Sequence, residues 1–128
     1  MKLTMVGTGY VGLVTGVCFS QTGNHVTCLD VDPRKIEKLK KGVCPIYEPG
    51  LEEMMERNYK AGRLQYTLDK QEAYRDAEMI FICVGTPSDE RGHTDLKYVH
   101  AAADDIADML KALGPNQKPK VIVMKSTV

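Results

Sequence analysis

Three glycines near the N-terminus have the spacing of a phosphate-binding turn. Residues 7–12, GTGYVG, read G-x-G-x-x-G and stand between an apolar run and a helix-like stretch. In such a pattern Gly7 permits the tight turn, Gly9 lets a pyrophosphate approach the backbone, and Gly12 lets the helix pack closely on the strand. The N-terminus of the helix adds free N–H groups and a partial positive charge. The pattern predicts a dinucleotide site, and a purely structural glycine turn is the alternative.

An acidic residue follows at the distance that such a site requires. Asp30 lies 18 residues after Gly12 and 23 after Gly7, at the end of the second apolar run. Its carboxylate can accept hydrogen bonds from both hydroxyls of the adenosine ribose, and it repels the 2′-phosphate of NADP. NAD is therefore the favoured cofactor. Arg34 and Lys35 weaken the discrimination, because a nearby cation can flank a phosphate or the adenine.

Two further segments end apolar runs and fall at the edge of the expected sheet where ligands bind in open parallel sheets. They are Val84-Gly85-Thr86-Pro87 and Lys125-Ser126-Thr127. The Thr86 hydroxyl can hydrogen-bond a cofactor, and the hydroxyls of Ser126 and Thr127 suit a nicotinamide or a substrate oxygen. Ordinary turns built from these residue types are the alternative at both places.

The other reactive side chains lack the spacing of a site. No spacing links the three histidines as metal ligands, so no metal site is expected. No set of Ser, His and acid supports hydrolytic chemistry. The cysteines show no C-x-x-C spacing, and we expect buried, reduced thiols, as in a cytoplasmic protein. They are Cys18, Cys28, Cys44 and Cys83.

Strand-like and helix-like stretches alternate along the chain and can hold these segments at one edge. Strands are expected over 3–6, 25–30, 64–67, 78–84 and 120–125. Helices are expected over 10–22, over 51–60 and over 95–113, with a short helix that begins at 33 and a short helix or turn over 69–77. The helix over 95–113 has an apolar stripe at Leu96, Val99, Ala103, Ile106, Leu110 and Leu113. Strands that are apolar on both faces indicate a parallel sheet covered on both sides, a Rossmann-like doubly wound α/β fold.

Composition and charge indicate one globular domain of 128 residues. Lys and Arg number 17 and Asp and Glu also number 17, so no overall basic charge favours nucleic acid or an anionic membrane. The longest apolar run has six residues, whereas a membrane helix needs ~20. We expect a cytoplasmic protein without a signal peptide. Because the chain stops directly after a strand, we expect 1–128 to be a fragment of a longer protein, truncated after a central strand, with exposed apolar surface.

Six motifs taken together resemble the UDP-glucose/GDP-mannose dehydrogenase family. In chain order they are MKLTMVGTGYVGLV, DVDPRKI, PIYEPGL, FICVGTP, DLKYV and KSTV. The resemblance runs from Met1 to Val128 and is far more specific than the glycine motif alone. It implies that residues 1–128 are the N-terminal NAD-binding domain of such an enzyme.

The resemblance implies an NAD-dependent oxidation of the C6 alcohol of a nucleotide sugar to a carboxylate, in two hydride transfers. An aldehyde-level intermediate is captured by a cysteine thiolate, and the resulting thioester is hydrolysed. That nucleophilic cysteine lies later in the family's chain, and no cysteine here occupies its place. Overall likeness favours UDP-glucose as substrate, with GDP-mannose as the alternative, and a homodimer for the full-length enzyme. We expect the chain alone to be inactive.

The resemblance also implies which residues bind NAD. The predicted cofactor-binding residues are Gly7, Gly9, Tyr10, Val11, Gly12, Asp30, Lys35, Val84, Gly85, Thr86, Ser126 and Thr127. Thr127 has an additional, auxiliary catalytic role, because it faces the reacting centre and helps to hold a water. Two alternatives remain, a stand-alone nucleotide-sensing regulatory module and the cofactor domain of another dehydrogenase, such as one acting on hydroxy acids. Neither is expected to carry the PIYEPGL motif.

Overall fold

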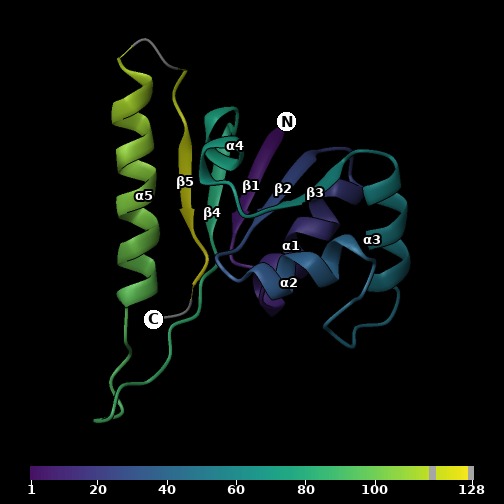
Figure 1. Cartoon of the computed structure of the whole chain (residues 1–128), viewed down its shortest axis with the longest axis horizontal. Helices are drawn as coiled ribbons and strands as arrows, with labels where there is room; N and C mark the ends of the chain where they lie inside the picture. The colour runs from purple at the N-terminus through teal and green to yellow at the C-terminus, as the bar shows by residue number, and fades with distance from the viewer. Residues whose placement is uncertain (116–117, 127–128) are drawn as a thin grey trace.

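Strands and helices alternate along the chain much as the sequence predicts (Figure 1). The computed structural model describes residues 1–115 and 118–126. The strands are β1 (Lys2–Val6), β2 (His25–Leu29), β3 (Leu64–Thr67), β4 (Met79–Ile82) and β5 (Val121–Met124). The helices are α1 (Tyr10–Gln21), α2 (Pro33–Lys40), α3 (Leu51–Lys60), α4 (Lys70–Arg75) and α5 (Lys97–Leu113).

All five strands form one parallel sheet in the order β3-β2-β1-β4-β5. Met5 of β1 is paired with Cys28 of β2 on one side and with Phe81 of β4 on the other. The chain builds outward from β1 through β2 to β3 and then crosses to β4 on the opposite side of β1. This reversal leaves a crevice at the carboxyl ends of β1 and β4, where doubly wound sheets bind ligands. The predicted fold class is confirmed.

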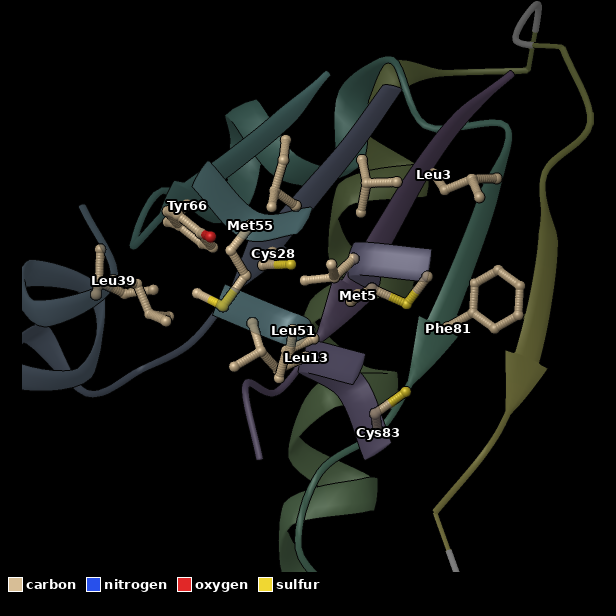
Figure 2. Packing of buried hydrophobic residues seen from close by; sticks show 14 residues of the cluster. Leu3, Met5, Leu13, Cys28, Leu39, Leu51, Met55, Tyr66, Phe81 and Cys83 are labelled. Atoms are coloured by element: carbon tan, nitrogen blue, oxygen red, sulfur yellow. The ribbon is translucent and has the colours of Figure 1, made fainter. Parts of the chain in front are cut away.

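Alternate residues of the strands face two separate cores, because successive side chains of a strand point to opposite faces. On one face, Leu3 and Met5 belong to a cluster that includes residues of α1, α2 and α3, and Leu13 of α1 lies beside Leu51 of α3 there (Figure 2). On the other face, Ile80 of β4 and other strand residues pack against α4 and α5. Helices therefore cover both sides of the sheet, as predicted.

Helix α1 lies unusually close to the sheet because its inward face carries glycines four residues apart. A Cβ atom at Gly16 would lie 3.0 Å from Cγ of Met5 and 3.1 Å from Sγ of Cys28. A Cβ atom at Gly12 would lie 2.0 Å from the carbonyl oxygen of Gly7. Gly12 and Gly16 share one face because a helix turns once in 3.6 residues. This close packing fixes the N-terminus of α1 directly above the end of β1.

The apolar stripe predicted for α5 is only partly correct. Val99 and Ile106 are buried, but Ala103 and Leu110 are exposed, and Ala102 takes the buried position between them. The buried residues are spaced by three and four, and Ala102 and Ile106 pack in one cluster with residues of α4 and β4. Ala103 and Leu110 lie on the other flank of the helix, where no described element covers them. The apolar stripe predicted from the sequence therefore covers more of the helix surface than the face that is buried.

Strand β5 lies at the edge of the sheet and exposes apolar side chains. Val121, Ile122 and Met124 are 54%, 43% and 49% exposed, so the prediction that every strand is buried on both faces is wrong for β5. The chain thus has the exposed apolar surface expected from its sequence. In the described part of the chain, no helix has the length and apolar character needed to cross a membrane.

The four cysteines are free, but their burial differs from the prediction. Cys28 and Cys83 are buried and Cys44 is half-buried, whereas Cys18 is exposed. The prediction of a buried thiol is wrong for Cys18 because its neighbour Val17 takes the inward position on α1. Burial raises the pKa of the Cys28 thiol to about 12 and that of the Cys83 thiol to about 11. Both thiols are therefore protonated near neutral pH.

Candidate cofactor-binding site

A cavity of about 620 Å³ opens at the carboxyl edge of the sheet, where the strand order reverses. Its volume falls in the range of small-molecule sites. Predicted site residues that line it are Gly7, Gly9, Tyr10, Val11, Asp30, Lys35, Val84, Gly85, Thr86 and Ser126. Gly12 lies behind this lining, and Thr127 lies outside the described residues. A smaller cavity, of about 320 Å³, borders Lys2 and His25 at the opposite edge, away from the usual ligand position.

The glycine turn has the geometry that its spacing predicts. Gly7 has φ +105°, a conformation that other residues rarely adopt, and a Cβ atom there would lie 2.7 Å from the carbonyl oxygen of Cys83. Gly12 has no room for a side chain because of the Gly7 carbonyl. A Cβ atom at Gly9, by contrast, would meet nothing within 4 Å. Gly7 and Gly12 therefore shape the turn, and Gly9 leaves open space on the cavity side.

The N-terminus of α1 opens onto the cavity without a side-chain cap, a lack that α3 and α5 share. No side chain caps α1, and its first turn contains no acidic residue. In contrast, the side chains of Asp32 and Asp69 cap α2 and α4. The first N–H groups of a helix have no partner within it, and they carry the positive end of its dipole. This uncapped end, facing open space at Gly9, fits the diphosphate of a dinucleotide.

The Asp30 carboxylate is held by the glycine turn itself. The N–H and hydroxyl of Thr8 donate to Oδ2 at 2.9 and 2.6 Å, and the N–H of Asp32 donates to Oδ1 at 3.0 Å. A carboxylate has about four acceptor positions, so open capacity remains on Oδ1. The predicted contact with ribose hydroxyls fits this geometry. Sequence reasoning missed Thr8, although its place between the two glycines and its hydroxyl were visible.

Hydrogen bonding keeps Asp30 charged despite its partial burial. Burial by itself raises the pKa of the Asp30 carboxyl, but the hydrogen bonds from Thr8 and Asp32, with the charge of Lys35, outweigh it and leave the pKa below its ordinary value of 3.8. A charged carboxylate is the form that accepts hydroxyl donors and repels a 2′-phosphate. The site is thus in its binding form throughout the neutral range.

The lowered pKa predicts how Asp30 contributes to stability at different pH values. A group with a depressed folded-state pKa stabilises the protein above its unfolded-state pKa, and this contribution is lost as the pH falls through the folded-state value. Asp30→Asn should therefore be less stable than the unaltered chain at pH 7, and the difference should shrink below about pH 4. Urea unfolding at a series of pH values measures this difference. A difference that does not change with pH would contradict the assignment.

A hydrogen bond joins the glycine turn to the loop that carries the PIYEPGL motif. The hydroxyl of Tyr10, the first residue of α1, donates to Oε2 of Glu48 at 2.9 Å. This bond and the negative charge of Glu48 raise the pKa of the Tyr10 hydroxyl. In the sequence, the PIYEPGL segment is identified only as a motif of the family resemblance. The structure places its acidic residue against a residue that lines the cavity.

Ser126 is fixed by the neighbouring strand end. Its hydroxyl donates to the carbonyl oxygen of Val84 at 2.8 Å, and its N–H donates to that of Ile82 at 3.0 Å. These bonds hold the segments after β4 and β5 together on one wall of the cavity. The hydroxyl oxygen of Ser126 keeps acceptor capacity, and its predicted contact with a nicotinamide or substrate stays a prediction.

Sequence reasoning missed the far wall of the cavity, which lies beyond Asp30. It consists of Val31, Lys70, Tyr74, Tyr98, Ala101, Ala102 and Asp105. Val31 and Tyr98 stand in the DVDPRKI and DLKYV motifs, but no local pattern marks the other residues, because they become neighbours only when α4 packs against α5. An ion pair between Lys70 and Asp105, at 2.8 Å, joins the two helices there. Among the described residues, no group of three or more His, Cys, Asp or Glu side chains is placed to hold a metal ion.

Comparison with known proteins gives one family match that covers the whole chain. Residues 1–128 match the family model described as "UDP-glucose/GDP-mannose dehydrogenase family, NAD binding domain". The chain is 47% identical over 128 residues to UDP-glucose 6-dehydrogenase YwqF and 50% identical over 127 residues to UDP-glucose 6-dehydrogenase TuaD, both of Bacillus subtilis. The matches cover 100% and 99% of this chain, but only 28% and 26% of those proteins. The chain thus spans little more than a quarter of the length of these relatives.

A solved structure has the same fold over the whole chain. It is a ternary complex of GDP-mannose dehydrogenase from Pseudomonas aeruginosa, with a TM-score of 0.92 and 37% sequence identity. The match covers 100% of this chain and 29% of that chain. Both the curated relatives and this structure are therefore dehydrogenases of nucleotide sugars, and they favour an enzyme over a stand-alone sensing module.

Proposed function

Since the chain belongs to the UDP-glucose/GDP-mannose dehydrogenase family and matches its NAD binding domain, we propose that it is the cofactor domain of a UDP-glucose 6-dehydrogenase. The observation that carries this proposal is the attachment of Asp30 to the glycine turn through Thr8, beside the uncapped end of α1. One rigid unit thereby offers a site for a diphosphate and a site for the adjoining ribose. The cavity at the carboxyl edge of the sheet contains both sites.

In this proposal each wall of the cavity takes one part of NAD. The first N–H groups of α1 bind the diphosphate, and Gly9 leaves the space for it. Asp30 accepts from the adenosine ribose, with Lys35 nearby. The segments at 84–86 and Ser126 border the nicotinamide end, and Thr127 has the auxiliary catalytic role that the family resemblance implies. Bound NAD supplies the hydride acceptor, and the chain's own residues bind and orient it.

We propose the activity of the full-length enzyme from the relatives that the chain matches. UDP-glucose is the substrate named for both curated relatives, and GDP-mannose is the alternative because a neighbour in structure is named for it. Residues 1–128 then form one NAD-binding domain, and the full-length enzyme is a cytoplasmic homodimer that oxidises UDP-glucose to UDP-glucuronate with two NAD. The free thiols support a reducing compartment.

The proposal predicts that the chain binds NAD but does not turn over substrate. The family resemblance implies that none of its four cysteines is the nucleophile, and Cys28 and Cys83 are buried, protonated thiols. Calorimetric titration should show NAD binding, and incubation with NAD and UDP-glucose should give no increase in NADH absorbance. The full-length enzyme under the same conditions is the positive control. Accumulation of NADH with the chain alone would refute the predicted inactivity, and absence of NAD binding would refute the proposed function.

A further inference from the structure

We infer that Lys70 and Asp105, at the far wall of the cavity, recognise the adenine base of the bound dinucleotide by hydrogen bonding. This inference rests on the proposed function and deepens it, because it assigns a role to residues that neither the sequence motifs nor the glycine turn accounts for. The two residues come from different helices, and their ion pair at 2.8 Å forms part of the cavity wall.

The course of the dinucleotide follows from the two sites already placed. With the diphosphate at the end of α1 and the adjoining ribose at Asp30, as proposed, the base would continue past Asp30 toward the residues of α4 and α5 that line the same cavity. On the other side of the α1 N-terminus, the part of the cavity at Val84 and Ser126 is the proposed site of the nicotinamide. The base therefore reaches the wall that contains Lys70 and Asp105.

This part of the cavity has the features that a flat aromatic base requires. Val31 directly follows Asp30, lines the cavity and is 77% exposed, so its side chain is available to cover one face of a ring. Ala101 and Ala102 line the opposite helix with small side chains that leave room for the ring. Burial of the apolar Val31 surface under the base is favourable in itself.

The ion pair presents an acceptor and a donor next to each other. The ammonium group of Lys70 forms an ion pair with Oδ2 of Asp105 and has N–H donors to offer a ligand, and Oδ1 of Asp105 stays an acceptor. Adenine carries an exocyclic amine, a donor, beside ring nitrogens that accept. The amine can donate to Asp105 while a ring nitrogen accepts from Lys70. The side chains are 45% and 34% exposed, so the pair is accessible and not sealed in a core.

The charges around the pair fit a base better than a second phosphate. Lys70 is paired with Asp105, and the other charged residues of the lining are two acidic and two basic ones, Asp30, Asp32, Lys35 and Lys125, so the cavity has no net positive charge. The negative charge of Asp105 acts on Tyr74 as well, since burial first and Asp105 second raise the pKa of that buried hydroxyl. A neutral heterocycle that carries both hydrogen-bond donors and acceptors is the kind of ligand that fits this part of the cavity.

Hypoxanthine provides the test, because its C6 position carries an acceptor where adenine carries the amine that faces Asp105, and its adjacent ring nitrogen N1 carries a proton where that of adenine accepts. In nicotinamide hypoxanthine dinucleotide a carbonyl oxygen replaces the amine, and this acceptor would oppose the carboxylate. We expect the unaltered chain to bind NAD about tenfold more tightly than the hypoxanthine analogue, as befits one lost hydrogen bond to a charged group. Calorimetric titration with each dinucleotide measures the ratio.

Variants separate base recognition from a merely structural ion pair. Asp105→Ala should bring the two affinities within about twofold of each other, and Asp105→Asn, which keeps an acceptor oxygen, should retain part of the preference. Asp104→Ala removes an exposed carboxylate one residue away and should keep the full preference. Thermal unfolding of each variant confirms that it is folded.

The outcomes also distinguish the inference from the proposed function. Equal affinity of the unaltered chain for NAD and its hypoxanthine analogue would overturn the inference while the proposed function stands. An unchanged ratio in Asp105→Ala, even with weaker binding of both dinucleotides, would assign the pair a structural role and overturn the inference too. If neither dinucleotide bound, the proposed function would fail, and the inference with it.

Discussion

Replacing Gly12 with alanine is expected to lower NAD affinity by at least tenfold and to destabilise the fold by roughly 1–3 kcal/mol. The new Cβ atom would lie 2.0 Å from the carbonyl oxygen of Gly7 and 3.1 Å from Cβ of Cys83. The Gly7 atom belongs to the backbone and cannot rotate away, so the first turn of α1 must move off β1. That movement displaces the N–H groups that face the diphosphate.

A matched substitution separates the loss of binding from the loss of stability. Gly9→Ala introduces the same atom where nothing lies within 4 Å, and Gly9 has φ −74°, which alanine adopts readily. We expect Gly9→Ala to keep the melting temperature while weakening NAD binding, because the methyl group occupies the approach of the diphosphate. Thermal unfolding and calorimetric titration measure the two properties. If Gly12→Ala retained both its stability and its affinity, the described geometry of the turn would be wrong.

Asp30→Asn is expected to remove the preference of the chain for NAD over NADP. A hydrogen bond to a charged group contributes about 1.5–3 kcal/mol, so loss of the carboxylate charge should weaken NAD binding by roughly tenfold or more. The same change removes the repulsion of a 2′-phosphate and leaves Lys35, which lines the same cavity, free to attract it. NAD affinity should therefore fall while NADP affinity rises.

Asp32→Asn is the control for this experiment. Asp32 lines the same cavity, but its side chain caps α2 by accepting from the N–H of Arg34 at 2.9 Å. Asparagine caps helices about as well as aspartate, so this variant should keep the preference for NAD. Titration of both variants with NAD and NADP gives the ratios. Equal affinity of the unaltered chain for the two cofactors would contradict the role of Asp30.

Local sequence patterns predicted the parts of the site that are local in the chain. The glycine spacing determines the turn at 7–12, and the position of Asp30 after an apolar run places it at the same edge of the sheet. Alternation of strands and helices was sufficient to predict the parallel sheet, because apolar strands without polar faces need cover on both sides. These inferences needed no knowledge of how distant segments pack.

The features that were missed depend on contacts between distant segments. Lys70 and Asp105 are separated by 35 positions and meet only because α4 packs on α5. The bond between Tyr10 and Glu48 similarly spans 38 positions. Exposure of Cys18 and Leu110 depends on which side of each helix receives a neighbour. Periodicity gives the apolar side of a helix, but its exact rotation is set by the elements that pack against it.

The three hydrogen bonds on Asp30 have a consequence for the energetics of association. Thr8 and Asp32 already orient the carboxylate, so docking of a ribose freezes almost no additional torsional freedom at this residue. Preorganisation of this kind reduces the entropic cost of complex formation. The carboxylate that binds the cofactor is therefore ordered before binding. Less of the interaction free energy is lost to ordering the protein, and the affinity is correspondingly higher.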